Sequence, residues 1–268
     1  MDNITQIDYK GELTKRSKKK PSWLVVKLAR WFLIEDWVNE KLRRIGPAQN
    51  LDFMATTLKE LNIKVEVKGA ENLPSPTELS MFACNHPLGG MDVLSACCAV
   101  SSACTQGLLI PANDLLMQLK NISGMLIPVN KVGGQSKDLL DKINAAYASN
   151  NQLMFFPAGK VSRKHKDGIY DDAWKKNFIV KSVQFQRNVI PVRIDAKNSP
   201  FFYRLAKLRA KLGIKLNLEM LFLVRETRKQ SNKTITVTIG KPIPWQYFDA
   251  SKTANEWAQE VRKIVYEL

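Results

Sequence analysis

Short apolar runs alternate with amphipathic segments along most of the chain. Five of the six residues 79–84 are apolar, which predicts a strand buried on both faces. Similar runs predict strands at residues 108–112, 126–130, 153–156 and 189–194, with segments of helical periodicity between them. This rhythm predicts an α/β fold with a mixed, largely parallel sheet flanked by helices.

The N-terminal part follows a different pattern. Residues 1–20 end in KRSKKK and have little apolar content, as is typical of a tail. Residues 22–45 predict one amphipathic helix that carries three tryptophans and basic flanks. This helix either docks on a membrane surface or packs on the protein's own core. We expect residues 1–46 to form a tail and docking helix, and residues 47–268 the main domain.

The last third contains another apolar stripe with basic flanks. It runs at helical spacing from Phe201 to Leu212 and stops at Gly213. The stripe predicts either a membrane-facing helix or the wall of a tunnel for an apolar ligand. Strands are expected at residues 215–224 and 234–239, and a closing helix at residues 255–267.

Composition and charge narrow the class of protein. A chain of 268 residues with 45% hydrophobic content can bury a full core. The net charge of +16 fits nucleic acid, an anionic membrane surface or an acidic protein. The basic residues lie beside bulky apolar ones, which favours a membrane over nucleic acid. No apolar run reaches the roughly 18 residues of a spanning helix, and the N-terminus lacks a secretion signal. We therefore expect a peripheral protein on the cytoplasmic face of the cell membrane.

The candidate chemistry lies directly after the first buried strand, in the sequence NHPLGGMD at residues 85–92. A proline and two glycines place His86 in a loop at the strand end, where ligands gather in α/β sheets. Asp92 could orient the imidazole for proton transfer, or the two could be an ordinary hydrogen-bonded pair. The other histidine, His165, lies in a lysine-rich loop. Asp171 and Asp172 are interpreted as charges at a helix start.

Three further loops follow later strands: GMLIPVNK at residues 124–131, FFPAGKVSR at 155–163 and VIPVR at 189–193. In this order, the four loops resemble the four motifs of the glycerolipid acyltransferases related to bacterial lysophosphatidic acid acyltransferase. The resemblance covers roughly residues 60–245. It is strongest to the branch often labelled hemolysin-like, which acylates ornithine-type and glycine-type aminolipids and in which NHPLGG and FPAG are typical.

The resemblance implies a fold like that of glycerol-3-phosphate acyltransferase and a specific reaction. His86, oriented by Asp92, would act as general base while a monoacylated amino-acid lipid attacks the thioester of acyl carrier protein or coenzyme A. Gly89 and Gly90 would let backbone N–H groups approach the oxyanion. No metal or other cofactor is implied. The substrate-binding residues implied are Asn85, Lys131, Pro157, Gly159, Lys160, Ser162 and Arg163.

Two departures from the family pattern bear on the acceptor. Five residues separate His86 from Asp92, where the family usually has four. The third motif has Ala158 and Val161 in place of a glutamate and an arginine, and that arginine helps to hold phosphate in the family. The sequence therefore favours an aminolipid acceptor. Acylation of lysophosphatidic acid or glycerol phosphate is the alternative, and a noncatalytic, membrane-associated lipid-binding module is an alternative of another class.

Overall fold

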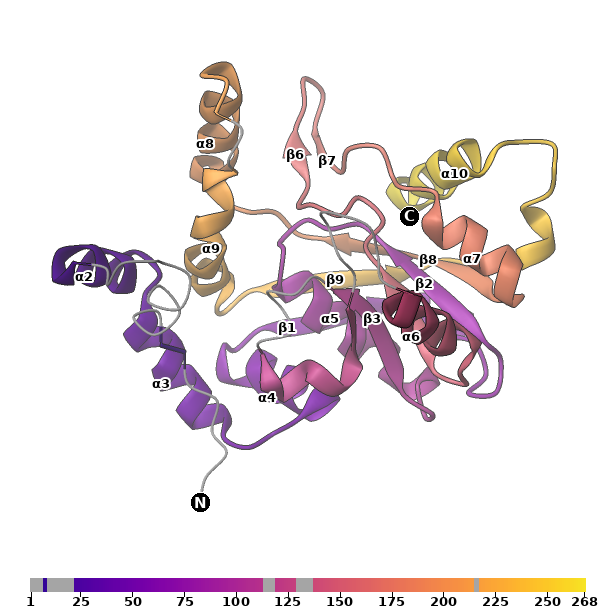
Figure 1. Cartoon of the computed structure of the whole chain (residues 1–268), viewed down its shortest axis with the longest axis horizontal. Coiled ribbons are helices and arrows are strands. Elements are labelled where there is room, and N and C mark those ends of the chain that lie inside the picture. Colours follow the sequence, from indigo (N-terminus) through magenta and orange to yellow (C-terminus); the bar gives the residue numbers. More distant parts are fainter. Residues whose placement is uncertain (1–6, 9–21, 113–118, 129–136, 215–216) are drawn as a thin grey trace.

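A central sheet carries helices on both faces (Figure 1). The computed structural model describes residues 7–8, 22–112, 119–128, 137–214 and 217–268. In the described part, the main sheet has the order β1-β9-β8-β2-β5-β3-β4, and all neighbours are parallel except β8 and β9. The predicted α/β fold is confirmed. The strands are β1 (Lys64–Lys68), β2 (Ser80–Cys84), β3 (Leu108–Ala112), β4 (Leu126–Pro128), β5 (Gln152–Phe155), β8 (Asn188–Asp195) and β9 (Thr234–Ile239).

Strand β2 lies inside the sheet, and all five of its residues are buried. Successive strand side chains point to opposite faces. Phe82 and Cys84 therefore enter one hydrophobic core, and Met81 and Ala83 enter the other. The first core is covered by α4 (Asn50–Glu60) and α5 (Met91–Val100), and the second by α6 (Lys137–Ala148), α7 (Asn177–Phe185) and α10 (Ala254–Glu267).

The parallel pairing brings two of the motif loops to the same edge of the sheet. In the register, Ala83 of β2 lies opposite both Phe155 of β5 and Pro191 of β8. The carboxyl ends of β2 and β5 are therefore neighbours. The loop that follows β2 carries His86, and the loop that follows β5 carries the third motif, so the fold sets them side by side.

The single helix predicted for residues 22–45 is wrong in one respect, because the chain forms two helices, α2 (Trp23–Phe32) and α3 (Glu35–Ile45). Ile34, between them, has a left-handed backbone with φ of 47°. The guanidinium of Arg225 donates to the carbonyls of Trp31 and Phe32, at 2.7 Å each, and so satisfies the end of α2. A side chain from far along the sequence thus stabilises the break.

The two N-terminal helices differ in burial. Leu42 and Ile45 of α3 belong to the core that α4 and α5 cover, whereas α2 has no buried residue. Packing on the protein's own core is therefore correct for α3 and wrong for α2. The domain boundary at residue 46 stays a prediction. Among the described residues, no helix combines the length and the apolar character needed to cross a membrane.

The strand predicted at residues 215–224 is also wrong. The described residues form a short 3-10 helix, η5 (Leu218–Phe222), followed directly by α9 (Leu223–Gln230). The alternation of apolar residues favoured a strand. In the 3-10 helix, Glu219 is fully buried between the guanidinium groups of Arg163 and Arg209. Tertiary ion pairs therefore override the local pattern.

The remaining predicted elements agree with the structure apart from their ends. The helix expected to start beside Asp171 and Asp172 starts only at Asn177. Before the strand at residues 126–128, residues 113–118 lie outside the described part, and a 3-10 helix, η4 (Lys120–Met125), follows them. The stripe at residues 201–212 forms α8 (Pro200–Lys211), and the third-motif loop includes a small hairpin of β6 (Arg163–Lys164) and β7 (Ile169–Tyr170).

Candidate active site

His86 and Asp92 are in direct contact. The Nδ1 atom of His86 lies 2.9 Å from Oδ2 of Asp92, whose carboxylate comes from the first turn of α5 and is fully buried. The same oxygen accepts the backbone N–H groups of Leu88 at 2.8 Å and Gly89 at 3.0 Å. The loop between the two residues thus folds back over the carboxylate. Five intervening residues are therefore compatible with the contact.

The surroundings of Asp92 keep it ionised near neutral pH. Burial alone would raise the pKa of this carboxyl, but the neighbouring His86 ring and the N–H groups of Gly89 and Leu88 hold it below its ordinary value. A buried carboxylate that accepts several hydrogen bonds has a fixed orientation. It therefore holds the imidazole of His86 in one orientation and stabilises a protonated ring.

His86 lines a cavity of about 630 Å³. Gly89, Gly90, Pro157 and Gly159 line the same cavity, and most of the remaining wall is apolar, from α3, α4, α5, β3 and α7. The ring of Phe156 lies beside His86, with 4.8 Å between the ring centroids. A mostly apolar cavity with one polar catalytic candidate at its wall is suited to a ligand with an aliphatic chain.

Asp171 is a buried carboxylate that the sequence interpretation missed. The helix it was expected to start begins only at Asn177, and Asp171 instead lies in the loop before it, fully buried. Its carboxylate accepts the hydroxyl of Ser162 at 2.6 Å, the indole N–H of Trp174 at 2.9 Å and the backbone N–H of His86 at 3.2 Å. The local sequence carries no signal for this role, because His86 and Asp171 are 85 positions apart.

The two motif loops are also joined directly. The backbone N–H of Ser162 donates to the carbonyl of His86 at 2.8 Å. Helix α10 supports the arrangement from outside, because the hydroxyl of Tyr266 contacts the backbone N–H of Asp171 at 2.7 Å and Arg262 donates to its carbonyl. Burial raises the pKa of Asp171, and the bonds from Ser162 and Trp174 oppose that rise.

The predicted basic residues are mostly paired with carboxylates. Lys160 lies 2.5 Å from Asp172, and the guanidinium of Arg163 lies 2.8 Å from Glu219. Burial lowers the pKa of Arg163, and Glu219 opposes that change. Lys131 lies outside the described residues. Lys160 and Arg163 are thus each paired with a carboxylate in this structure, and Arg163 shares its carboxylate, Glu219, with Arg209.

Two other predicted substrate-binding residues, Asn85 and Ser162, make structural contacts. The side-chain amide of Asn85 is buried and exchanges two hydrogen bonds with the backbone of Ile194 in β8, at 2.7 and 3.0 Å. Ser162 is buried against Asp171. Pro157 and Gly159 do line the cavity. The structure therefore brings His86, Asp92, Pro157 and Gly159 to one place, and uses Asn85 and Ser162 to hold the loops there.

The described residues contain no group of three or more histidine, cysteine or acidic side chains that could hold a metal ion. The four cysteines are free, and three of them are buried. Burial raises the pKa of Cys84 and Cys97 well above the ordinary thiol value. These two residues therefore pack as neutral thiols.

Comparison with known proteins identifies the family. A family model described as "Acyltransferase" matches residues 14–268. Two relatives named lyso-glycine lipid O-acyltransferase, from Phocaeicola vulgatus and Bacteroides thetaiotaomicron, are each 40% identical over 270 residues, covering 100% of this chain and 96% and 99% of their own lengths. The crystal structure of the 1-acyl-sn-glycerophosphate (LPA) acyltransferase PlsC from Thermotoga maritima matches with a TM-score of 0.48 and 17% identity, over 91% of this chain and 95% of that one. The matches to the family model and to the two relatives show that the chain belongs to the acyltransferase family.

Proposed function

We propose that this protein transfers a fatty acyl group from an acyl thioester to the hydroxyl group of a monoacylated amino-acid lipid, of the lyso-glycine or lyso-ornithine type. The observation that carries the proposal is the contact between His86 and Asp92 at the wall of a largely apolar cavity. The names of the two full-length relatives support the lyso-glycine type of acceptor.

The geometry supports general base catalysis by His86. Because Asp92 holds Nδ1, Nε2 is the ring nitrogen that takes the proton from the acceptor hydroxyl. The hydroxyl oxygen then attacks the thioester carbonyl carbon and forms a tetrahedral oxyanion. As this intermediate collapses, the C–S bond breaks, the thiolate leaves, and the proton on His86 passes to it. The products are an ester and a free thiol, and the histidine is neutral again.

Gly89 and Gly90 differ as candidates for stabilising the oxyanion. The N–H of Gly89 already donates to Asp92. Gly90 precedes α5 as its N-cap residue and lines the cavity, so its N–H is the better donor of the two, aided by the positive end of the α5 dipole. Gly89 has another function: its φ is +90°, and an added Cβ would lie 2.8 Å from the side chain of Leu223.

The pairing of Lys160 and Arg163 bears on the choice of acceptor. A phosphate-bearing acceptor needs cations that are available to it. Both residues are already paired with carboxylates, and Val161 stands where the family's phosphate-binding arginine is expected. An amino-acid head group that bears a single carboxylate needs fewer available cations than a phosphate does. Acylation of lysophosphatidic acid or glycerol phosphate is therefore the second candidate.

An acceptor assay tests the proposal. Purified protein, supplied with a fatty acyl thioester of acyl carrier protein or of coenzyme A, is expected to acylate a lyso-glycine lipid at least about tenfold faster than lysophosphatidic acid. The measurement is the rate of diacylated product formation for each acceptor under matched conditions. Turnover with lysophosphatidic acid alone would contradict the aminolipid assignment.

The location and the donor belong to the same proposal. The strongly basic chain suits acyl carrier protein, which is acidic as a class, or the phosphates of coenzyme A. We further propose that residues 22–45 dock the protein on the anionic, cytoplasmic face of the membrane. The support is α2, which carries exposed Trp23, Leu28 and Trp31 together with basic neighbours.

Asp171 is expected to act as a positioning residue for His86. In the Asp171→Leu variant, the new side chain has a shape similar to that of aspartate. However, no acceptor remains for the backbone N–H of His86 or the indole N–H of Trp174. Each buried donor left unpaired costs about 1–3 kcal/mol. We expect kcat to fall by about 10²-fold with a much smaller change in KM, because the base is displaced while the cavity remains.

The conservative variant Asp171→Asn distinguishes a positioning role of Asp171 from a general loss of the folded structure. Asp171→Asn keeps one oxygen for Trp174 and His86, and its amide can face Ser162, whose hydroxyl is able to accept. We expect this variant to retain at least about a tenth of wild-type kcat. The assignment fails if Asp171→Leu is folded, by circular dichroism, and has wild-type kcat.

A further inference from the structure

Helix α8 exposes an apolar stripe on its outer face. Phe201, Leu208 and Leu212 are 44%, 54% and 63% exposed, and they recur at helical spacing. The opposite face, with Phe202 and Tyr203, is buried. None of the three stripe residues lines the cavity at His86. The interpretation of this helix as the wall of an acyl tunnel is therefore wrong for the described cavity, and the stripe faces outward.

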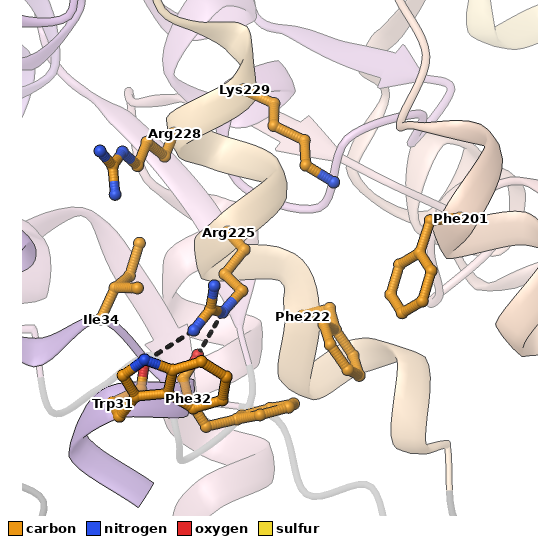
Figure 2. A pocket seen from close by; sticks show the side chains of 8 residues that line it. All are labelled: Trp31, Phe32, Ile34, Phe201, Phe222, Arg225, Arg228 and Lys229. Carbon is orange, nitrogen blue, oxygen red and sulfur yellow. Dashed lines mark hydrogen bonds between the residues drawn. The ribbon is translucent and has the colours of Figure 1, made fainter. Parts of the chain in front are cut away.

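Phe222 of η5 connects one end of the stripe with the end of α2. Phe222 of η5 stacks edge-on against Phe32 of α2, with 4.4 Å between centroids, and against Phe201 of α8, with 5.0 Å. These three rings, Trp31 and Ile34 surround a surface pocket of about 550 Å³ (Figure 2). Two segments far apart in the sequence thus bring their exposed apolar residues to the same part of the surface.

Three cationic side chains also line this pocket. Arg225, Arg228 and Lys229 of α9 line it, and Figure 2 shows Arg225 directed toward the end of α2. Arg225 donates to two neutral carbonyls, so no carboxylate cancels its charge within the described residues. Arg228 is exposed above the ring of Trp37, also without an acidic partner among those residues. Lys229 is paired with Glu226 at 2.7 Å. Two guanidinium charges are therefore available to an anion.

Helix α9 connects this pocket with the active-site cavity. Its residues Leu223, Val224 and Thr227 line the cavity at His86, whereas Arg225 and Arg228 line the surface pocket. A lipid surface that contacts the pocket would therefore lie one helix away from the cavity. That position suits an enzyme whose acceptor is itself a membrane lipid.

We propose that α2, η5 and α8 form one continuous membrane-docking face, with the phosphate of an anionic lipid bound in the pocket by Arg225 and Arg228. This inference rests on the proposed function, and it adds a second contact region to the N-terminal helix. The stripe and the tryptophans enter the boundary between head groups and acyl chains, and the guanidinium groups remain at the level of the phosphates. Exposed Leu208, Leu212 and Leu221 fit an apolar layer better than a duplex groove.

Vesicle sedimentation with the full chain tests the inference. The vesicles contain phosphatidylcholine with or without phosphatidylglycerol. We expect the double variant Leu208→Gln/Leu212→Gln to weaken binding to anionic vesicles by about tenfold, because two exposed apolar contacts are lost without any change in the core. Arg228→Gln should weaken binding to anionic vesicles by severalfold and leave binding to neutral vesicles unchanged.

Matched variants supply the controls. Leu140→Gln/Val180→Gln removes two residues of similar exposure from α6 and α7, on the opposite side of Figure 1, and should bind as the wild type does. Trp23→Gln/Leu28→Gln tests α2. If the α2 pair weakens binding and the α8 pair does not, docking is confined to the N-terminus and the inference is wrong.

Two other outcomes are also decisive. If none of these variants changes binding, docking through residues 22–45 fails together with the inference, while the acyl-transfer assay still stands on its own. If the α8 pair binds vesicles normally but raises KM for the thioester of acyl carrier protein, the stripe is a protein-binding surface, and the lipid inference is overturned.

Discussion

Replacing His86 by alanine is expected to lower kcat for acyl transfer by about 10²–10⁴-fold, the usual contribution of a general base. The substitution removes the group that takes the hydroxyl proton. It leaves Asp92 bound to the N–H groups of Leu88, Gly89 and Val93, so the loop should keep its shape. Thiol release from the acyl thioester, followed in the presence of a lyso-glycine lipid, measures the loss.

The other histidine gives a matched control. His165 stacks on Tyr170, with 4.0 Å between centroids, and lies near Asp172 rather than in the cavity. His165→Ala should therefore keep wild-type kcat within about threefold. A folded His86→Ala variant with unchanged activity would eliminate His86 as the general base.

The second large effect is expected for Asp92→Asn, with a fall in kcat of about 10²-fold and little change in KM. An asparagine can place its oxygen at the Oδ2 position and keep the N–H groups of Leu88 and Gly89, but its amide then faces the N–H of Val93. The negative charge that stabilises protonated His86 is lost as well. The kinetic measurement is the same thiol-release assay.

Asp172→Asn is the appropriate control for this charge change. It makes the same substitution on a carboxylate that is about one-third exposed and paired with Lys160. We expect kcat for this variant to stay within about threefold of the wild type. If Asp92→Asn is equally active while it remains folded, Asp92 serves only to shape the loop, and the pairing with His86 has no catalytic part.

The strands of the central sheet were predictable because they are local patterns. The run before His86, the strand Leu108–Ala112 and the run from Val189 all carry enough apolar residues to require burial on both faces. Two elements were misassigned where distant charges decide the backbone. Arg225 caps the end of α2, and Glu219 of the 3-10 helix at residues 218–222 pairs with Arg163 and Arg209.

The site was predictable in part. The loop at residues 85–92 indicated His86 and Asp92, but their contact depends on how five intervening residues fold, which spacing alone leaves open. Gly89 permits that fold through its positive φ and its close approach to Leu223. The pairing of Lys160 and Arg163 with carboxylates could not be read from the basic loop, since their partners depend on the folded arrangement of several segments.

By itself, the sequence determined the α/β class, the order of the motif loops and the position of His86 in a loop at a strand end, because hydrophobic periodicity and turn residues act over a few positions. Only the tertiary structure decided that Asp171 supports His86 and that α8 faces outward beside α2. These features join segments distant in sequence. Such contacts form only when the sheet has brought the segments together.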